Sequence, residues 1–268
     1  MPRACSWVST FLKISQEALD FQLKTLYPVK TKKDPLRVNL LFLNHDRNLS
    51  TFLTVRYLVE HGRVADIDCL SRSMFESTIA MGLIAKSLIA DDLVRYQTFQ
   101  YIEIHKTYNH LKRLGLERLS GIVPDEIASL TQQYNDYLKR WGRNTSTWSG
   151  QSLEQNVRLV DSSYPPTCNE QHFYEYLYCQ VYRKGSQSVH SSYGGLSIGV
   201  NTMAYKIGDS TFQWFKPDKD HLIFSSYHSL LVFLSSVRFL GHFIQKKETE
   251  DYFHRISRFI ISESTNTP

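Results

Sequence analysis

Several motifs that identify common enzyme classes are absent from this sequence. It contains no G-x-x-x-x-G-K-[ST], no G-x-G-x-x-G and no G-x-S-x-G, the patterns of nucleotide-binding loops and of esterase nucleophiles. It also contains no pair of acidic residues at the spacing of a metal-dependent nuclease. Nucleotide hydrolysis, esterase chemistry and metal-dependent cleavage therefore lack their usual signatures here.

Cysteine is scarce as well. The four cysteines, at positions 5, 69, 168 and 179, include no C-x-x-C pair, so they do not give the ligand pattern of a zinc site. Reduced thiols in a cytoplasmic protein are the simplest interpretation. We expect neither a bound metal nor a cofactor.

No apolar run near the N-terminus is long enough for a signal peptide. Leu222–Ile244 is long enough to span a membrane, but it contains His228, Arg238, His242 and several serines. Because a central arginine is costly in lipid, the segment is better interpreted as a buried or amphipathic helix. We expect no contact with a membrane.

The composition allows a sizeable core. The 268 residues are 42% hydrophobic and 13% aromatic, enough for one large domain or two small ones. The formal net charge is +5 and the pI is about 8.9. This charge favours an acidic partner such as nucleic acid, but it is weaker than that of a dedicated nucleic-acid-binding protein.

Apolar residues recur mostly at helical spacing, which predicts a mainly α fold. Long helices are expected over residues 6–26, 35–61, 64–90, 93–114, 124–141 and 219–245, with a shorter one over 251–261. A further helix is expected to begin at an N-cap, Asn169, and to carry residues 182–190. The segment around 203–215 has a turn at Gly208-Asp209 and predicts one small β-hairpin. We expect three segments, namely 1–34 (helix and basic connector), 35–245 (helical domain) and 246–268 (helix and polar tail).

Within that further helix, Arg183, Ser186 and His190 have the spacing of one helical face. A cation and an imidazole in this arrangement can bind a phosphate and move a proton, or they can be a surface arginine and a buried histidine. The spacing R-x4–6-H is expected about twice by chance in a chain of this composition. It occurs twice, as Arg183–His190 and as Arg56–His61.

The sequence context separates the two pairs. His61 precedes Gly62 at a helix end, where an imidazole commonly satisfies terminal carbonyl groups, so a structural role is favoured there. Arg183 instead follows a tyrosine-rich stretch that ends at Tyr182. Tyrosines beside a cation suit unstacked bases, although tyrosines at helical spacing are also typical of cores and interfaces.

Two other groups are candidates. Arg72 and Glu76, four residues apart on an apolar helix, form either a pair that fixes one protonation state or a partly exposed ion pair. Trp148-Ser149-Gly150 closes a polar loop and favours an anchored turn.

Three motifs, taken together, resemble a bacterial family of helical proteins of unknown function. They are R-S-M-F-E at 72–76, W-S-G-Q-S at 148–152 and Y-R-x-x-S-x-x-V-H at 182–190, and the resemblance covers about residues 35–245. That family is similar in turn to the HEPN ribonucleases. The resemblance implies a HEPN-like helical bundle with extra helices. This chain departs from HEPN proteins at Lys184, where a small polar residue is usual, and at Ser192, where some relatives have a tyrosine. We also expect Gly185 to kink the helix.

The resemblance also implies a site. Arg183 and His190 would be the catalytic pair, with Ser186 orienting phosphate or histidine. The supporting residues would be Arg72, Glu76, Trp148, Tyr182 and Tyr193. We therefore expect a metal-independent endoribonuclease toxin or effector of bacterial antiphage or toxin-antitoxin defence, acting on RNA as a dimer or with a defence-system partner. The alternative is a non-enzymatic helical sensor or regulatory partner, in which Arg183, Ser186 and His190 form a buried polar network.

Overall fold

The chain forms two compact units, which are described separately. The computed structural model describes residues 6–27, 34–61, 63–142, 146–167, 171–189, 200–207, 210–217 and 219–265. Unit 1 comprises residues 1–86 and 157–268, and unit 2 comprises residues 87–156. The expected segments 1–34, 35–245 and 246–268 stay a prediction.

The fold is mainly α, as the periodicity predicts. Unit 1 contains the helices α1 (Ser6–Leu26), α2 (Pro35–Glu60), α3 (Val64–Ala85), α7 (Phe173–Leu177), the π-helical segment η2 (Tyr178–Arg183), α8 (Lys184–Val189), α10 (Lys219–Phe243) and α11 (Lys247–Thr265). Unit 2 contains α4 (Asp92–Arg113), the 3-10 helix η1 (Glu117–Ser120) and α5 (Pro124–Trp141), and α6 (Leu153–Ser163) crosses from unit 2 into unit 1.

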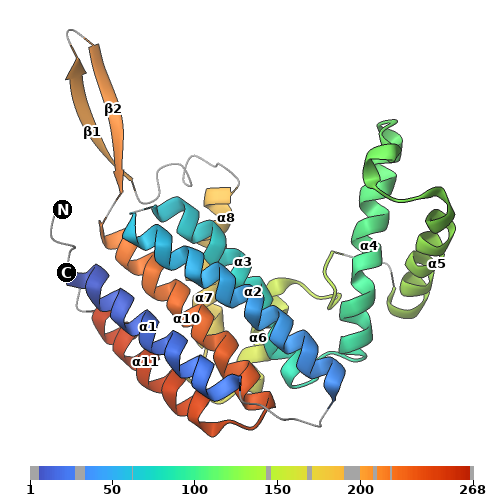
Figure 1. Cartoon of the computed structure of the whole chain (residues 1–268), viewed down its shortest axis with the longest axis horizontal. Helices are drawn as coiled ribbons and strands as arrows, with labels where there is room; N and C mark the ends of the chain where they lie inside the picture. Colours follow the sequence, from blue (N-terminus) through green and yellow to red (C-terminus); the bar gives the residue numbers. More distant parts are fainter. Residues whose placement is uncertain are drawn as a thin grey trace. The chain divides into compact units, whose positions relative to one another are not determined.

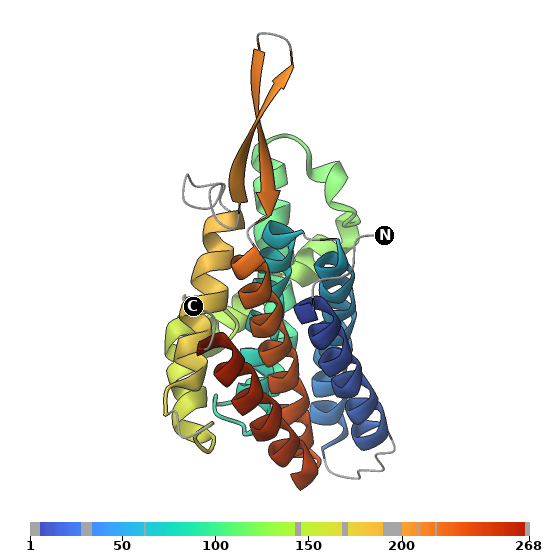
Figure 2. The same ribbon diagram turned by 90° about the vertical axis from the view of Figure 1, so that its left-hand side faces the viewer.

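The helix α10 is the centre of unit 1. It packs against α1, α2, α3 and α11, and Figures 1 and 2 show these helices running side by side. All residues from Ser225 to Gly241 are buried, as expected for a helix that is surrounded on all sides. Among the described residues, α10 is long and apolar enough to cross a membrane, but 89% of that window is buried inside the protein. Its apolar surface is therefore covered by the neighbouring helices, in agreement with the interpretation as a buried helix.

Aromatic rings and serines fill the space around α10. Phe233 stacks on Phe52 of α2 with ring centroids 4.5 Å apart, and Tyr227 meets Phe11 of α1 edge to face at 5.9 Å. The buried serines of α10 donate hydrogen bonds to carbonyl oxygens in the preceding turn, as Ser229 does to Ser225 at 2.6 Å. Small polar residues can thus be buried without unpaired hydroxyl groups, and the neighbouring helices can approach closely.

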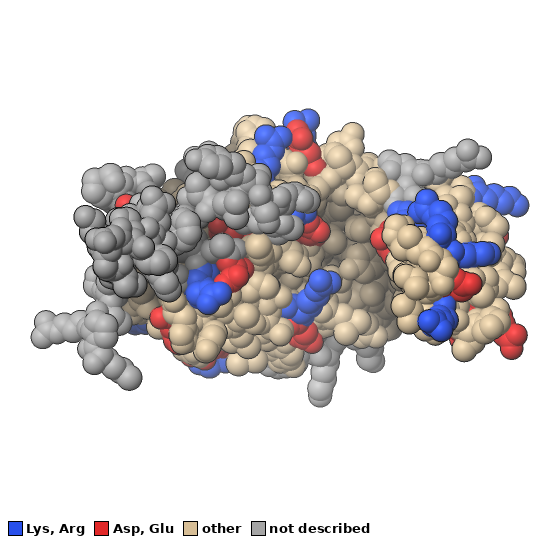
Figure 3. Space-filling model, turned by 90° about the horizontal axis from the view of Figure 1, so that it is seen from above, with Lys and Arg blue, Asp and Glu red and all other residues tan. Residues whose placement is uncertain are grey.

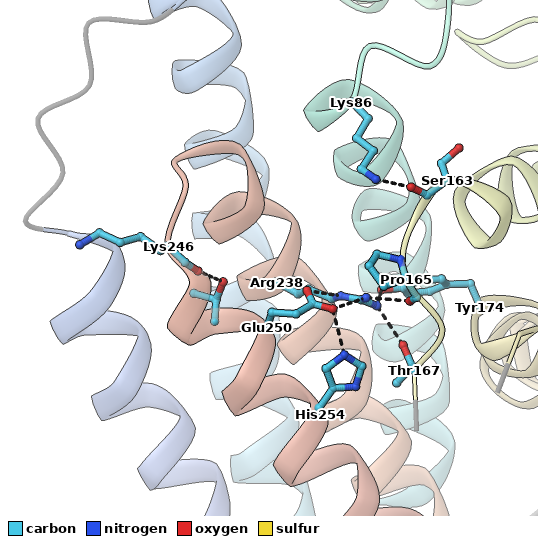
Figure 4. Close-up of polar contacts among 10 residues, drawn as sticks. Lys86, Ser163, Pro165, Thr167, Tyr174, Arg238, Lys246, Glu250 and His254 are labelled. Atoms are coloured by element: carbon cyan, nitrogen blue, oxygen red, sulfur yellow. Dashed lines mark hydrogen bonds and ion pairs between the residues drawn. The ribbon is translucent and has the colours of Figure 1, made fainter. Parts of the chain in front are cut away.

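A buried arginine in α10 forms hydrogen bonds with several neighbouring segments of unit 1 (Figure 4). Arg238 of α10 has no exposed surface, and its Nε and Nη2 donate to the two carboxylate oxygens of Glu250 in α11 at 2.8 and 2.5 Å. Its Nη1 donates to Thr167 at 2.9 Å and to the Tyr174 hydroxyl at 3.1 Å, and Nη2 also donates to the carbonyl of Pro165 at 3.0 Å. The five hydrogen bonds join α7, α10, α11 and the segment that follows α6.

Local signals set most helix ends. At α2 the Asp34 side chain accepts a hydrogen bond from the Arg37 amide, and Pro35 occupies the first turn. The helix α3 ends at Ala85, five residues before the expected end, because Ser87, just after the C-cap Lys86, has a positive φ angle of 53°. Asp91 is the N-cap of α4, as expected, but its carboxylate pairs with Arg140 at 2.8 Å instead of capping the helix.

The small hairpin lies where the sequence predicts it. Strands β1 (Val200–Ile207) and β2 (Ser210–Pro217) pair antiparallel, with Ile207 opposite Ser210 and Met203 opposite Trp214. The two residues of the expected turn lie outside the described residues.

Candidate functional site

The Arg183 motif lies on a helix that changes pitch. From Phe173 the chain runs through α7, then through the π-helical residues Tyr178–Arg183, and continues as α8 to Val189. π-helical turns are rare, and those that occur are frequently found at functional sites. Arg183 is exposed at the end of this π-helical segment. His190 and Tyr193 lie outside the described residues, so their predicted roles stay predictions.

The N-terminus of this helix is capped from elsewhere in the fold. The carboxylate of Asp161 in α6 accepts hydrogen bonds from the amides of Tyr174 and Glu175 at 2.9 and 2.8 Å. The N-cap position is His172, and Asn169, the expected cap, lies outside the described residues. The expectation that the helix begins at Asn169 is therefore corrected, and a carboxylate from α6 satisfies the free amides instead.

Two tyrosines and two arginines form a surface that we call the tyrosine–arginine face, consisting of Arg72, Tyr178, Tyr182 and Arg183. The rings of Tyr178 and Tyr182 stack with centroids 5.2 Å apart at an interplanar angle of 13°. The guanidinium carbon of Arg72 lies 4.8 Å from the centroid of Tyr182, and that of Arg183 lies 5.3 Å from the centroid of Tyr178. Each cation thus lies over one ring of the pair, within the range of cation–π attraction.

The ion pair of Arg72 and Glu76 borders this face. Their side chains are 19% and 49% exposed, and the Arg72 Nε lies 3.4 Å from the Glu76 carboxylate. A long, half-exposed pair of this kind contributes at most about 1 kcal/mol. The geometry favours the interpretation of a partly exposed pair. Its role here is to orient Arg72, which also reaches the Tyr182 hydroxyl at 3.5 Å.

Gly185 is required by close packing. It lies inside α8, and a Cβ atom at this position would be 2.6 Å from the Asp68 carbonyl oxygen and 2.9 Å from the Arg72 Cβ. Only glycine therefore allows α8 to approach α3 this closely. The expected kink at Gly185 stays a prediction.

Ser186 is half-buried, and its hydroxyl donates to the carbonyl of Tyr182 at 2.8 Å. Its only proton is thus used within the helix, and its oxygen retains lone pairs that can accept a hydrogen bond. In this conformation Ser186 can orient a protonated imidazole, while it has no proton to offer a phosphate.

A second polar group, which the sequence reasoning missed, lies where α3, α8 and α10 meet. We call it the histidine–lysine cluster, and it consists of Asp68, Lys184, His221 and His228. The Nε2 of His221 lies 2.9 Å from the Asp68 carboxylate, and the Lys184 ammonium lies 4.1 Å above the Phe224 ring. That ring also stacks on His228 with centroids 3.8 Å apart.

Burial lowers the pKa of two members of the cluster. His228 is 2% exposed, and burial lowers its pKa to about 4, so the ring is neutral. Its Nδ1 donates to the Phe224 carbonyl at 2.7 Å, so its Nε2 accepts from the Tyr176 hydroxyl at 2.7 Å. Burial also lowers the pKa of Lys184, an effect that the charge of Asp68 opposes.

The spacing of His221, Phe224 and His228 at i, i+3 and i+7 was a usable signal, since these positions share one face of α10. The partner Asp68 is 153 residues away in sequence and could not be identified from the spacing. Among the residues that the structure describes, no group of three His, Cys, Asp or Glu side chains could hold a metal ion.

Trp148 belongs to unit 2, where its loop is fixed by several contacts. The carbonyl of Trp148 accepts from the Tyr137 hydroxyl at 3.3 Å, and its ring meets Tyr96 edge to face at 5.1 Å. Ser149 is 2% exposed and accepts a hydrogen bond from Asn156 at 2.9 Å. These contacts agree with an anchored turn, and a supporting role for Trp148 at the catalytic pair stays a prediction.

The second R-x4–6-H pair has the structural role that its context favours. His61 ends α2, and its Nδ1 lies 2.7 Å from the Tyr57 carbonyl oxygen in the last turn. Arg56 reaches Gln16 of α1 at 3.2 Å. The two side chains therefore serve the end of α2 and its packing against α1.

A family of unknown function (DUF5677) matches residues 38–202, which is more than half of the chain. The chain belongs to this family. The matched DUF5677 region contains Asp68, the Arg72–Glu76 pair, Trp148 and Arg183, and it ends before His221. No curated protein and no solved structure matches the chain.

Proposed function

We propose that this DUF5677 protein is a metal-independent endoribonuclease, a toxin or effector of bacterial defence that is related to the HEPN ribonucleases. The observation that carries the proposal is the exposed Arg183 at the end of a π-helical turn, beside the stacked pair of Tyr178 and Tyr182. Exposure also favours this function over a buried polar network, which would require Arg183 to be inaccessible to solvent.

The tyrosine–arginine face has the chemistry of a site for single-stranded RNA. Guanidinium groups bind phosphate in a planar, two-pronged geometry, and aromatic rings stack on unpaired bases. Arg183 would bind the scissile phosphate, while the neighbouring pair of tyrosines and Arg72 would hold the adjacent nucleotide. We expect the substrate to be unpaired RNA, because a base in a duplex offers no free face for stacking.

The reaction needs no metal. In the proposed step, His190 removes the proton of a ribose 2′-hydroxyl, the 2′-oxygen bonds to phosphorus, and the bond from phosphorus to the 5′-oxygen breaks. Arg183 stabilises the negative charge that develops on the phosphoryl oxygens. The products are a 2′,3′-cyclic phosphate and a 5′-hydroxyl end. Because one imidazole does not readily serve both proton transfers, the resemblance to HEPN proteins implies a dimer with two Arg/His pairs across a shared cleft.

Charge on the surface is mixed. In the view of Figure 3, lysine and arginine side chains are interspersed with acidic ones. In unit 2, the last turn of α4 carries His110, Lys112 and Arg113, and η1, which packs against α4, carries Arg118. A short basic surface of this kind would add salt-dependent affinity for RNA without sequence preference.

The direct test is expression of the wild type, Arg183→Ala and His190→Ala in bacteria, followed by growth measurement and mapping of RNA ends. Purified protein should cleave RNA in the presence of EDTA and leave cyclic phosphate ends, and both variants should lower the rate by at least about 100-fold. RNA that stays intact under all conditions, together with undiminished toxicity of His190→Ala, would exclude the function.

A partner-binding role is the second candidate, and exposed apolar residues of unit 2 favour it. Leu114, Leu119 and Val123 are 58%, 66% and 53% exposed. In the same unit, an open hollow of about 350 Å³ lies between α4 and α5, lined by Tyr101, Ile104, Ile122, Glu126, Ser129, Leu130 and Gln133. Exposed apolar side chains are typical of a protein-interaction surface when they form a patch. If Leu119→Glu abolishes the effect in cells while RNA cleavage in vitro is unchanged, this surface binds a defence-system partner.

A further inference from the structure

We infer that the outward side of α2 binds a second copy of this chain, with the two α2 helices paired antiparallel about a two-fold axis. None of the residues that carry this inference belongs to the tyrosine–arginine face or to unit 2. The inference therefore goes beyond the proposed function and does not rest on it.

The helix α2 is apolar on two opposite sides. Its inward side packs in the core of unit 1 through residues that include Leu41, Phe52 and Val55. Its outward side carries four large apolar side chains. These are Leu36, Leu43, Leu53 and Tyr57, which are 40%, 65%, 46% and 60% exposed. A surface helix normally presents polar residues to solvent, so this exposed apolar side indicates a surface that another molecule covers.

The four exposed side chains form one stripe, which we call the α2 stripe. Successive residues of an α-helix are turned by about 100°, so Leu36, Leu43 and Tyr57 lie within about 60° of one another, and Leu53 borders them. Positions that are multiples of seven residues apart stay on the contact seam when two helices pair. The stripe is about 32 Å long, at 1.5 Å per residue. It therefore has the spacing of a helix-pairing surface.

The α2 stripe is complementary to itself when the second copy runs in the opposite direction. If the two-fold axis passes between positions 46 and 47, residues equally far from this point face each other. The facing pairs are then Leu36 with Tyr57, Leu40 with Leu53, and Leu43 with Ser50. Each pair occurs twice in a two-fold dimer. All four members of the stripe are thus covered by the same stripe of the second copy.

The antiparallel arrangement also pairs opposite charges at the centre of the contact. Asp46 and Arg47 are both exposed, and as adjacent residues of one helix they do not face each other. In the dimer, Asp46 faces Arg47 of the second copy, and the reverse pair forms by symmetry. A parallel pair of helices would instead place Asp46 beside Asp46 and Arg47 beside Arg47. Charge therefore favours the antiparallel direction.

The size of the contact predicts a weak dimer. The helix α1 packs beside α2 and widens the apolar surface with Leu23 and Tyr27, which are 52% and 44% exposed. The Tyr27 ring meets Phe42 of α2 edge to face with centroids 5.9 Å apart, and its hydroxyl donates to Asp46. A surface about 32 Å long and two helices wide is near the lower limit for a specific interface. We expect a dissociation constant in the micromolar range.

The test is analytical ultracentrifugation of the full chain between about 1 and 200 µM, where the wild type should show an equilibrium of monomer and dimer. Leu43→Glu should raise the dissociation constant at least about 30-fold, because the contact then buries two uncompensated charges. Asp46→Arg should raise it at least about 10-fold, since four cations then meet at the centre. The double variant Asp46→Arg/Arg47→Asp should dimerise again, because opposite charges face each other once more.

Phe259→Glu is the matched control, because Phe259 lies in α11 of the same unit, is 37% exposed and is not part of the α2 stripe. It should change the dissociation constant by less than about 2-fold. Every replaced side chain is exposed, so circular dichroism should show the helical content of the wild type in each variant.

Four results would overturn the inference. A wild type that stays monomeric at about 200 µM would show that the α2 stripe does not bind a second copy. A dimer that persists in Leu43→Glu would be formed by another surface, and equal weakening by Phe259→Glu would show that the effect is not specific to the stripe. Failure of the double charge reversal to restore the dimer would exclude the antiparallel pairing. RNA cleavage is not part of this measurement, so each outcome is independent of the proposed function.

Discussion

The buried Arg238 gives the sharpest prediction on stability. Replacing it by Met keeps the length and apolar stem of the side chain, but it removes all five hydrogen bonds of the guanidinium. Glu250 then loses the guanidinium and keeps its contact with His254 at 3.0 Å, and the Tyr174 and Thr167 hydroxyls lose a partner. Breaking a buried ion pair by removing one member costs about 3–5 kcal/mol, since the other charge stays uncompensated.

The magnitude can be measured by urea unfolding of unit 1. With a slope of ~3 kcal/mol per molar urea, the loss lowers the unfolding midpoint by about 1 to 1.7 M. The double variant Arg238→Met/Glu250→Gln should recover part of the loss, because it no longer leaves a carboxylate without its partner. The helix that carries Arg183 should also exchange its amide protons faster, since Tyr174 lies in its first turn.

The matched control is Arg63→Met. Arg63 pairs with Asp66 on the surface of the same unit, with side chains 66% and 50% exposed, so its replacement should cost less than about 1 kcal/mol. If Arg238→Met lowers the midpoint no more than Arg63→Met does, the reasoning about the buried network is refuted.

Three further outcomes are expected. His45 is fully buried, and its burial lowers its pKa to about 4, below the unfolded value of 6.5. The contribution of His45 to the free energy of unfolding is therefore complete above pH 6.5 and falls by roughly 3 kcal/mol toward pH 4. In urea unfolding measured at several pH values, His45→Gln should make this dependence on pH weaker. Gly185→Ala should lower the midpoint of thermal unfolding and displace α8 from α3, because overpacking costs about 1–3 kcal/mol and exceeds the gain in helix propensity. An unchanged midpoint would contradict the close contact between α8 and α3. Ser149→Ala should destabilise unit 2 by about 1–3 kcal/mol by leaving Asn156 unpaired, measured by hydrogen exchange, and no change in exchange would count against the anchored turn.

The sequence by itself determined the helical elements. Asp34 and Pro35 fix the start of α2, Pro124 starts α5, and the Gly208-Asp209 dipeptide separates the two strands of the hairpin. These signals work because a cap or a turn depends on residues within about four positions of each other. The Arg72–Glu76 pair was predictable for the same reason, since positions i and i+4 lie on one face.

Only the tertiary structure decided the environment of the site. Asp161 caps the helix of Arg183 from α6, Asp68 reaches His221 from α3, and the stacking of Arg72 on Tyr182 joins two helices. Each of these contacts links residues that are far apart in sequence, and their pairing depends on how α3, α8 and α10 pack. Local propensity contains no information about such contacts, because the free energy that selects them comes from burial shared by the whole bundle.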